Sequence, residues 1–106
     1  MHPAIAAKLD DIIRLCRAHG VKRLEVFGSA ARGDDFDPAT SDADFLVEFH
    51  DWARKPWMGE FAEFETALSQ VLGRKVDLMS LGALDHMRNR FRKASIERDR
   101  EPFYAG

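Results

Sequence analysis

A chain of 106 residues is long enough to bury one hydrophobic core, so we expect a single domain over residues 1–106. Hydrophobic residues make up 45% of the chain and charged residues 32%, a composition that excludes a disordered or fibrous protein. The net charge of −2 gives no general electrostatic reason to bind nucleic acid, and we expect no direct nucleic-acid binding.

The chain also lacks the signals of exported and membrane-inserted proteins. A single cysteine, Cys16, excludes an internal disulfide and a thiolate zinc cluster. No apolar stretch approaches the length of a membrane span, and the first residues do not form the apolar part of a secretory signal. A cytoplasmic location without membrane contact is therefore expected.

The first predicted element is one amphipathic helix that ends before Gly20. Pro3 suits the first position of a helix, and Gly20 suits the position that follows a helix end. Cys16 lies on the apolar stripe, so we interpret it as an inert core residue and not as a nucleophile. The stripe consists of Ile5, Leu9, Ile12, Ile13 and Cys16, at helical spacing.

Two strands are predicted next, over residues 21–27 and 42–49, with a polar loop over residues 33–41 between them. The loop is rich in Asp, Pro and Thr, which favour turns, and its acids are interpreted as solvated. Alternation along the second strand places Asp42 and Asp44 on one face and its aromatic residues on the other.

The second half of the chain predicts a helix over residues 58–72, a strand over 74–79 and a last helix from residue 81 onward. Trp52 and Trp57 flank the loop before the first of these helices, and we favour packing contacts over nucleobase stacking for both. The last helix carries many charges, among them Arg92, which we interpret as a solvated face that leaves room for a partner surface. Phe103 and Tyr104 are expected to close the core or to contact a partner. This order of elements predicts an α+β (α/β-like) fold with a small mixed sheet flanked by helices.

A glycine–serine turn follows the first strand. Gly28 has no Cβ, so its backbone can adopt a positive φ and let a ligand approach closely. Ser29 adds a hydroxyl, and the next residues favour a helical turn whose first N–H groups would face an anion. Arg32 could contact a phosphate through two hydrogen bonds, or pair with an acid such as Asp34 or Asp44, and both interpretations stay open.

Three acids in strands indicate a cation. Asp42 and Asp44 would lie on one face, where two carboxylates about 4 Å apart repel by about 4 kcal/mol at an effective dielectric near 20. A divalent metal or a metal-bound triphosphate removes that cost. Asp44 and Asp77 each lie between apolar residues, where an unpaired acid is costly to bury. For Asp77 the structural alternative is a salt bridge to Arg74 or Lys75. The pattern thus predicts a metal–nucleotide site.

The pair Gly28-Ser29, followed after twelve residues by Asp42-x-Asp44, resembles the signature of the DNA polymerase β-like nucleotidyltransferase superfamily. The surrounding residues 27–34 and 41–49 are similar to its minimal nucleotidyltransferase (MNT) branch. The resemblance covers residues 21–81, and the flanking helices more weakly. It implies the minimal polymerase β-like fold and a third carboxylate at Asp77.

The resemblance also implies the chemistry of the site. Asp42 and Asp44 would bind Mg²⁺, with two ions expected, and Asp77 would act as third ligand or as general base. Gly28 and Ser29 would hold the β- and γ-phosphates of ATP. The predicted site thus comprises Asp42, Asp44 and Asp77 for catalysis and metal binding, and Gly28, Ser29 and Arg32 for the nucleotide.

Members of the MNT branch are commonly encoded with a HEPN-domain toxin, for which the MNT protein is the antitoxin. Some members transfer AMP from ATP to a tyrosine of that toxin. The resemblance implies this role here, with a hetero-oligomer of toxin and antitoxin as an expected assembly. The alternatives are a non-catalytic antitoxin that acts by binding alone, and an enzyme that modifies a small hydroxyl compound.

Overall fold

The computed structural model describes residues 1–33, 36–37 and 42–106 of the chain. Most of the loop predicted over residues 33–41 lies outside the described residues, and so does the pairing of Arg32 with Asp34 that was considered above. In the part of the chain that is described, no helix is both long and apolar enough to cross a membrane.

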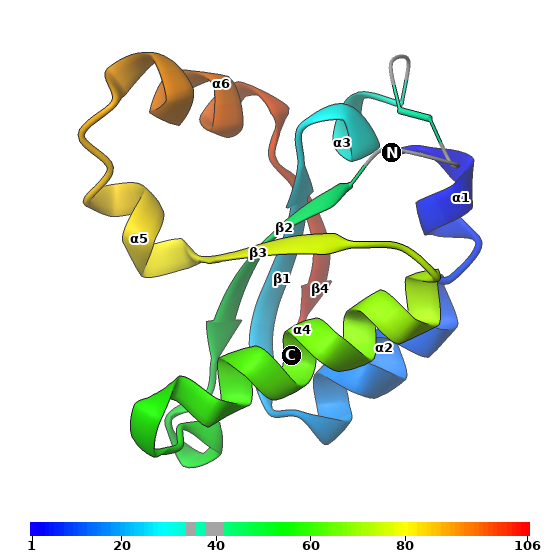
Figure 1. The fold of residues 1–106 in the computed structure, drawn as a ribbon, viewed down its shortest axis with the longest axis vertical. Coiled ribbons are helices and arrows are strands. Elements are labelled where there is room, and N and C mark those ends of the chain that lie inside the picture. Colours follow the sequence, from blue (N-terminus) through cyan, green and yellow to red (C-terminus); the bar gives the residue numbers. More distant parts are fainter. Residues whose placement is uncertain (34–35, 38–41) are drawn as a thin grey trace.

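Four strands form one mixed sheet in the order β3-β2-β1-β4 (Figure 1). The inner strand β1 (Val21–Phe27) runs antiparallel to β2 (Ala43–Phe49) and to β4 (Glu101–Ala105). The edge strand β3 (Val76–Ser80) is parallel to β2. The predicted α+β fold is confirmed, and the three predicted strands are found to within two residues at each end.

The main core lies on one face of this sheet. Helices α2 (Leu9–Ala18) and α4 (Gly59–Leu72) lie side by side against it (Figure 1). Alternate strand residues such as Val26 and Phe45 point into this layer and are fully buried. Cys16 is also fully buried here, as predicted, and its burial raises the pKa of the thiol to about 12.

A second, smaller core lies on the opposite face of the sheet. Helices α5 (Leu81–Asp85) and α6 (Arg90–Asp99) bury Leu84 and Ile96 against Phe27 of β1 and Leu46 of β2. Phe27 is the last residue of β1, directly before Gly28. The second core therefore holds α6 beside the end of β1, where the predicted nucleotide site begins.

Both terminal helices of the prediction are divided in the structure, which corrects two expectations. α1 (Pro3–Ala6) and α2 replace the first helix, and α5 and α6 replace the last. Of the two additional helix starts, that of α2 after Lys8 has no side-chain cap, whereas that of α6 has one. The side chain of Asn89 accepts hydrogen bonds from the backbone N–H groups of Phe91 and Arg92, each at 3.1 Å, where α6 begins. At the start of α1, Nδ1 of His2 accepts one from the N–H of Ala4 at 3.0 Å.

The strand β4 was not predicted. Its pairing partner β1 lies about 80 residues earlier in the sequence, so local periodicity carries little information about it. Phe103 and Tyr104 of β4 are partly buried against the main core, which confirms the expectation that they help to close it.

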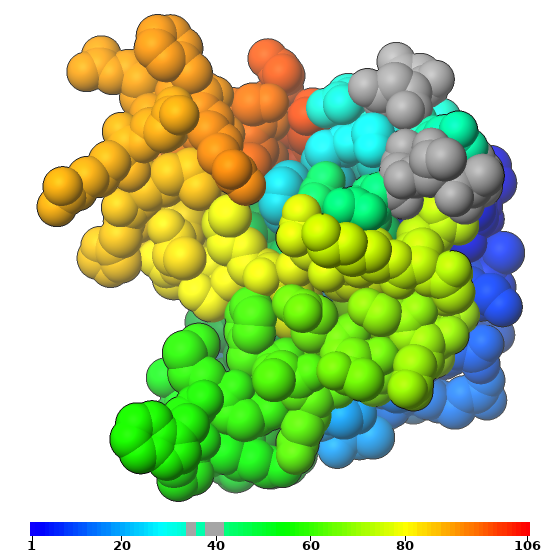
Figure 2. Space-filling view, viewed as in Figure 1, coloured from blue at the N-terminus to red at the C-terminus, as the bar shows by residue number. Residues whose placement is uncertain are grey.

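The two tryptophans were predicted to make packing contacts. This expectation is wrong for Trp57, whereas the ring of Trp52 stacks on that of His50 with centroids 6.0 Å apart. Trp52 is 73% exposed and Trp57 is 99% exposed. They belong to two short 3₁₀ helices, η1 (Asp51–Ala53) and η2 (Pro56–Met58). Trp57 and Met58 both have a positive φ, so the backbone does not continue the register of α4 that would turn Trp57 inward. Beside Met58, a groove of about 370 Å³ separates the start of α4 from α5, and it forms a notch in the outline of the molecule (Figure 2).

Candidate active site

The glycine–serine turn leaves β1 as the sequence predicts. Gly28 has φ of 69° and ψ of −152°, a backbone conformation that favours glycine. α3 (Ser29–Arg32) follows as a single helical turn, and the carbonyl of Gly28 accepts hydrogen bonds from the N–H groups of Ala31 and Arg32. Gly33 closes the turn with φ of 84°. Gly28 thus permits a sharp change of direction at the end of the strand.

Asp44 and Asp77 are directly paired across two parallel strands. Asp44 of β2 is in register with Asp77 of β3 on one side and with Phe27 of β1 on the other. Residues in register on neighbouring strands project from the same face of the sheet and are separated by about 5 Å. The structure therefore brings two of the three predicted acids together, next to the residue that precedes Gly28.

The environment of Asp44 disfavours its charged form. Burial is the largest cause, and repulsion from Asp77 and then from Asp42 adds to it, so that the pKa of Asp44 rises from 3.8 to about 6. The positive charges of Arg92 and Arg32 oppose this rise. A carboxylate held in this way gains stability when a cation approaches it.

Asp77 is exposed, whereas Asp42 and Asp44 are both partly buried. Asp42 precedes β2, and its Oδ2 atom lies 3.8 Å from Nζ of Lys75. That side chain was the structural alternative as a partner for Asp77, and in the structure it lies against Asp42 instead. Both side chains of this ion pair are largely solvated, so the contact contributes little to stability.

A small cavity connects the acid pair with the second core. It has a volume of about 100 Å³, and Arg92 of α6 contributes the only positive charge among its lining residues. Sequence reasoning did not single out Arg92, because it is one of several cations on a charged helix. A signal was nevertheless present, since Arg92 lies four residues before the apolar Ile96 and so on the same helix face. The lining residues are Phe27, Asp44, Asp77, Leu78, Met79 and Arg92.

Arg32 is paired with an acid that the sequence analysis did not consider. Its Nη1 atom lies 2.5 Å from Oδ2 of Asp99, at the end of α6. The side chain of Asp99 is only 7% exposed, and Nε of Arg98 lies 3.6 Å from its other oxygen. Asp44 was one of the partners proposed from the sequence. The positive charge of Arg32 lowers the pKa of Asp44, but the ion pair of Arg32 is with Asp99. This contact ties α3 to α6 on the two sides of the cavity.

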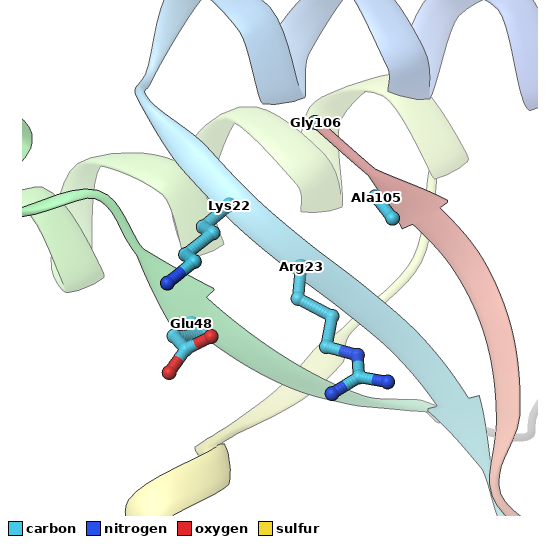
Figure 3. A pocket seen from close by; sticks show the side chains of 5 residues that line it. All are labelled: Lys22, Arg23, Glu48, Ala105 and Gly106. Atoms are coloured by element: carbon cyan, nitrogen blue, oxygen red, sulfur yellow. The ribbon is translucent and has the colours of Figure 1, made fainter.

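A larger hollow of the described surface lies elsewhere. It has a volume of about 530 Å³ and is formed by β1, β2 and the end of β4. Figure 3 shows Lys22, Arg23 and Glu48 on its open side, and none of the predicted site residues lines it. Its lining combines two cations with one acid and offers no converging set of groups for catalysis, so the acid pair remains the candidate site.

Comparison with known proteins identifies the family. Residues 10–102 match the sequence profile of the nucleotidyltransferase domain. The chain belongs to this family. A candidate protein adenylyltransferase of Methanocaldococcus jannaschii is 39% identical over 98 residues, which cover 88% of this chain and 92% of that protein. The protein adenylyltransferase MntA of Thermococcus cleftensis is 34% identical over 84 residues, covering 72% of this chain and 80% of that protein.

Solved structures share the nucleotidyltransferase fold. A candidate minimal nucleotidyltransferase superposes with a TM-score of 0.69 at 31% identity, with 96% of each chain covered. A toxin–antitoxin complex with AMP-PNP gives a TM-score of 0.64 at 20% identity, covering 92% of this chain and 73% of that chain. A complex of a tri-AMPylated Shewanella oneidensis HEPN toxin with its MNT antitoxin gives 0.60 at 17% identity, covering 95% and 72%. The two more distant neighbours support the fold alone, and the resemblance to minimal nucleotidyltransferases is confirmed.

The acids of this nucleotidyltransferase have the chemistry that a hard divalent cation requires. Carboxylate oxygens are preferred ligands of Mg²⁺, and Asp44 and Asp77 line one cavity. Within residues 1–33, 36–37 and 42–106, no group of three or more His, Cys, Asp or Glu side chains converges closely enough to hold a metal ion as it stands. The acids therefore fit the ion by their chemistry and their charge, although three of them do not converge on one point among the described residues.

Proposed function

We propose that this chain is a magnesium-dependent protein adenylyltransferase that transfers AMP from ATP to a tyrosine hydroxyl of a HEPN-domain toxin. In this role it is the antitoxin of a toxin–antitoxin pair. The names of the two relatives support the activity on protein, and the kind of partner is taken over, as part of the proposal, from two fold neighbours that were solved as toxin–antitoxin complexes. A complex of toxin and antitoxin follows from this role.

The observation that carries the proposal is the pairing of Asp44 with Asp77 beside Gly28. Two acids in register on adjacent strands repel each other, and burial of Asp44 increases that cost. A protein that only binds a partner gains nothing from this arrangement. An enzyme that holds a metal-bound triphosphate does, because cations compensate the charges.

The residues divide the reaction between them. Asp42, Asp44 and Asp77 would hold Mg²⁺, which would supply positive charge to compensate the charge of the triphosphate. Gly28 lets the phosphates approach the backbone, Ser29 offers its hydroxyl to the β- and γ-phosphates, and Arg32 adds positive charge beside them.

Transfer forms a bond between the tyrosine oxygen and the α-phosphorus while the bond from that phosphorus to the bridging oxygen breaks. Pyrophosphate leaves with the electron pair of the broken bond. Asp77 is the most exposed of the three acids, so it is the one best placed to receive the proton of a hydroxyl that a partner protein presents.

The test is the intact mass of the HEPN-domain protein encoded beside this chain, after co-expression with the wild type or with Asp44→Asn. We expect mass increments of one or more AMP groups with the wild type and none with the variant. An unmodified partner that is nevertheless inhibited equally by both proteins would replace this proposal with inhibition by binding alone. An unmodified and uninhibited partner, together with AMP transfer to a small hydroxyl compound, would favour the third function.

A further inference from the structure

Among the described residues, Arg92 is the one cation that lines the cavity of Asp44 and Asp77, and the predicted site did not include it. We infer that Arg92 binds the β- and γ-phosphates of the nucleoside triphosphate and so determines the preference of this site for triphosphates over monophosphates. This inference rests on the proposed function, because it concerns the same site. It extends that site from the strands to α6.

The position of Arg92 is fixed by its helix. The side chain of Asn89 caps α6 and accepts a hydrogen bond from the backbone N–H of Arg92 itself, at 3.1 Å. One turn further along, Ile96 is 4% exposed and packs with Phe27 and Leu46 in the second core. Residues four apart lie on the same helix face. Arg92 therefore extends from the face of α6 that is turned toward the sheet. It lines the same cavity as Phe27, the last residue of β1 before Gly28.

Three other arginines around α6 are engaged by acids. Arg100 donates to both carboxylate oxygens of Glu25, at 2.5 and 3.0 Å. Arg32 and Arg98 both lie against Asp99. Among the described residues, no carboxylate lies within ion-pair distance of Arg92, although the cavity that it lines contains two of them. Its charge is thus directed at the cavity without being neutralised by a close partner.

The chemistry of a guanidinium suits this position. Its planar set of N–H donors can bind two oxygens of a phosphate at once, which an ammonium group cannot do with the same geometry. A triphosphate keeps net negative charge after it has bound Mg²⁺, and that charge increases at the leaving pyrophosphate during transfer. The acids can hold only the cation, so a positive side chain is required on the phosphate side. The cavity, at about 100 Å³, has room for roughly three water molecules and so for a group of phosphate size.

Isothermal titration calorimetry with Mg²⁺·AMP-PNP and with AMP tests the inference without any acceptor protein. We expect Arg92→Gln to weaken binding of Mg²⁺·AMP-PNP by about 10- to 100-fold, the range for a charge-assisted contact, and to leave binding of AMP unchanged. Arg92→Lys retains the charge but lacks the planar guanidinium. Its affinity for Mg²⁺·AMP-PNP is expected to lie between those of the wild type and Arg92→Gln. Arg90→Gln is the matched control, because Arg90 belongs to the same helix turn and does not line the cavity.

Two results overturn the inference. The first is wild-type affinity of Arg92→Gln for Mg²⁺·AMP-PNP. The second is an equal loss of affinity for AMP-PNP and AMP with a lowered Tm, which would make Arg92 a structural counter-ion of Asp44. If either result is found while AMP transfer by the wild type persists, only this inference fails. If the wild type binds no Mg²⁺·AMP-PNP at all, the proposed function fails together with it.

Discussion

A Cβ atom on residue 28 would lie 2.7 Å from Oδ2 of Asp44, closer than real Cβ contacts allow. Because Gly28 has no side chain, there is space for the carboxylate of Asp44 beside it. The carboxylate lies against the backbone of the turn because β1 and β2 pair through Phe27 and Asp44. This relationship links the glycine and the acid of the signature through a physical contact.

Gly28→Ala should displace Asp44 and abolish binding of Mg²⁺·ATP. Gly73→Ala is the matched control, because Gly73 has φ of 65°, close to the 69° of Gly28, and a Cβ there would meet nothing within 4 Å. Both substitutions force alanine to a positive φ. The cost is about 1 kcal/mol at Gly73, whose ψ of 29° is left-handed helical, and larger at Gly28, whose ψ of −152° is almost restricted to glycine. Melting temperatures measured with and without Mg²⁺·ATP separate the backbone strain of both variants from the loss of nucleotide binding expected only for Gly28→Ala. Equal nucleotide-dependent shifts in both variants would show that the contact with Asp44 does not matter for binding.

Asp44→Asn should make the protein more stable at neutral pH. Because the pKa of Asp44 is raised from 3.8 to about 6 in the folded state, the folded protein binds this proton more tightly than the unfolded chain does. The free energy of unfolding therefore decreases as the pH rises from about 4 to about 6, and the full cost is present above that range. Solvent screens this half-buried group, so we expect a gain of only about 1 kcal/mol for the variant at about pH 7.5.

Urea unfolding at about pH 4 and about pH 7.5 measures that gain, which should vanish at the lower pH. Asp51→Asn is the control, because the carboxylate of Asp51 is fully exposed and its removal should not produce this pH dependence. A constant difference between Asp44→Asn and wild type at both values would contradict the raised pKa.

Arg100→Met should destabilise the protein strongly. Glu25 is 2% exposed on β1, and Arg100, between α6 and β4, holds it with two hydrogen bonds. Removing the arginine leaves a buried carboxylate with only the contact to Nε of Arg23 at 3.2 Å, at a cost of about 3 kcal/mol.

Replacing both partners, in Glu25→Leu/Arg100→Met, should restore most of that loss, since no buried charge remains. Chemical denaturation of the two variants and of wild type gives the comparison. A double variant as unstable as Arg100→Met would mean that the arginine stabilises the protein through its packing rather than through its charge.

Cys16 should not react with iodoacetamide in the folded protein. The thiolate is the reactive form, and a thiol with a pKa near 12 that is fully buried provides almost none of it at about pH 8. Intact mass after labelling should show no adduct in buffer and one adduct in denaturant. Fast labelling in buffer would indicate that α2 opens readily from the main core.

Much of the site could be predicted from local sequence, because its residues belong to short elements with strong local signals. Alternating apolar residues define the strands that carry Asp44 and Asp77, and a glycine after the first strand permits the positive φ that Gly28 adopts. The burial of Cys16 followed from helical periodicity in the same way. Metal binding by Asp42, Asp44 and Asp77 stays a prediction.

The breaks in the terminal helices could not be predicted with the same certainty. The apolar spacing continues from α1 into α2 and from α5 into α6, so periodicity alone indicates one helix in each case. Asn89 caps a new helix start at α6, whereas α2 begins after Lys8 without a side-chain cap. Trp57 was misjudged for a related reason, since its exposure depends on a backbone conformation that is rare outside glycine.

The sequence by itself determined which residue types face each side of each strand, and with them the acids and the glycine of the candidate site. Only the tertiary structure decided that Arg32 pairs with Asp99, that Arg92 faces the acid pair and that β4 completes the sheet. Each of these contacts joins segments that lie far apart in the chain. Periodicity and turn chemistry reflect interactions between near neighbours, whereas the partner of a distant charge is selected by the packing of the whole molecule.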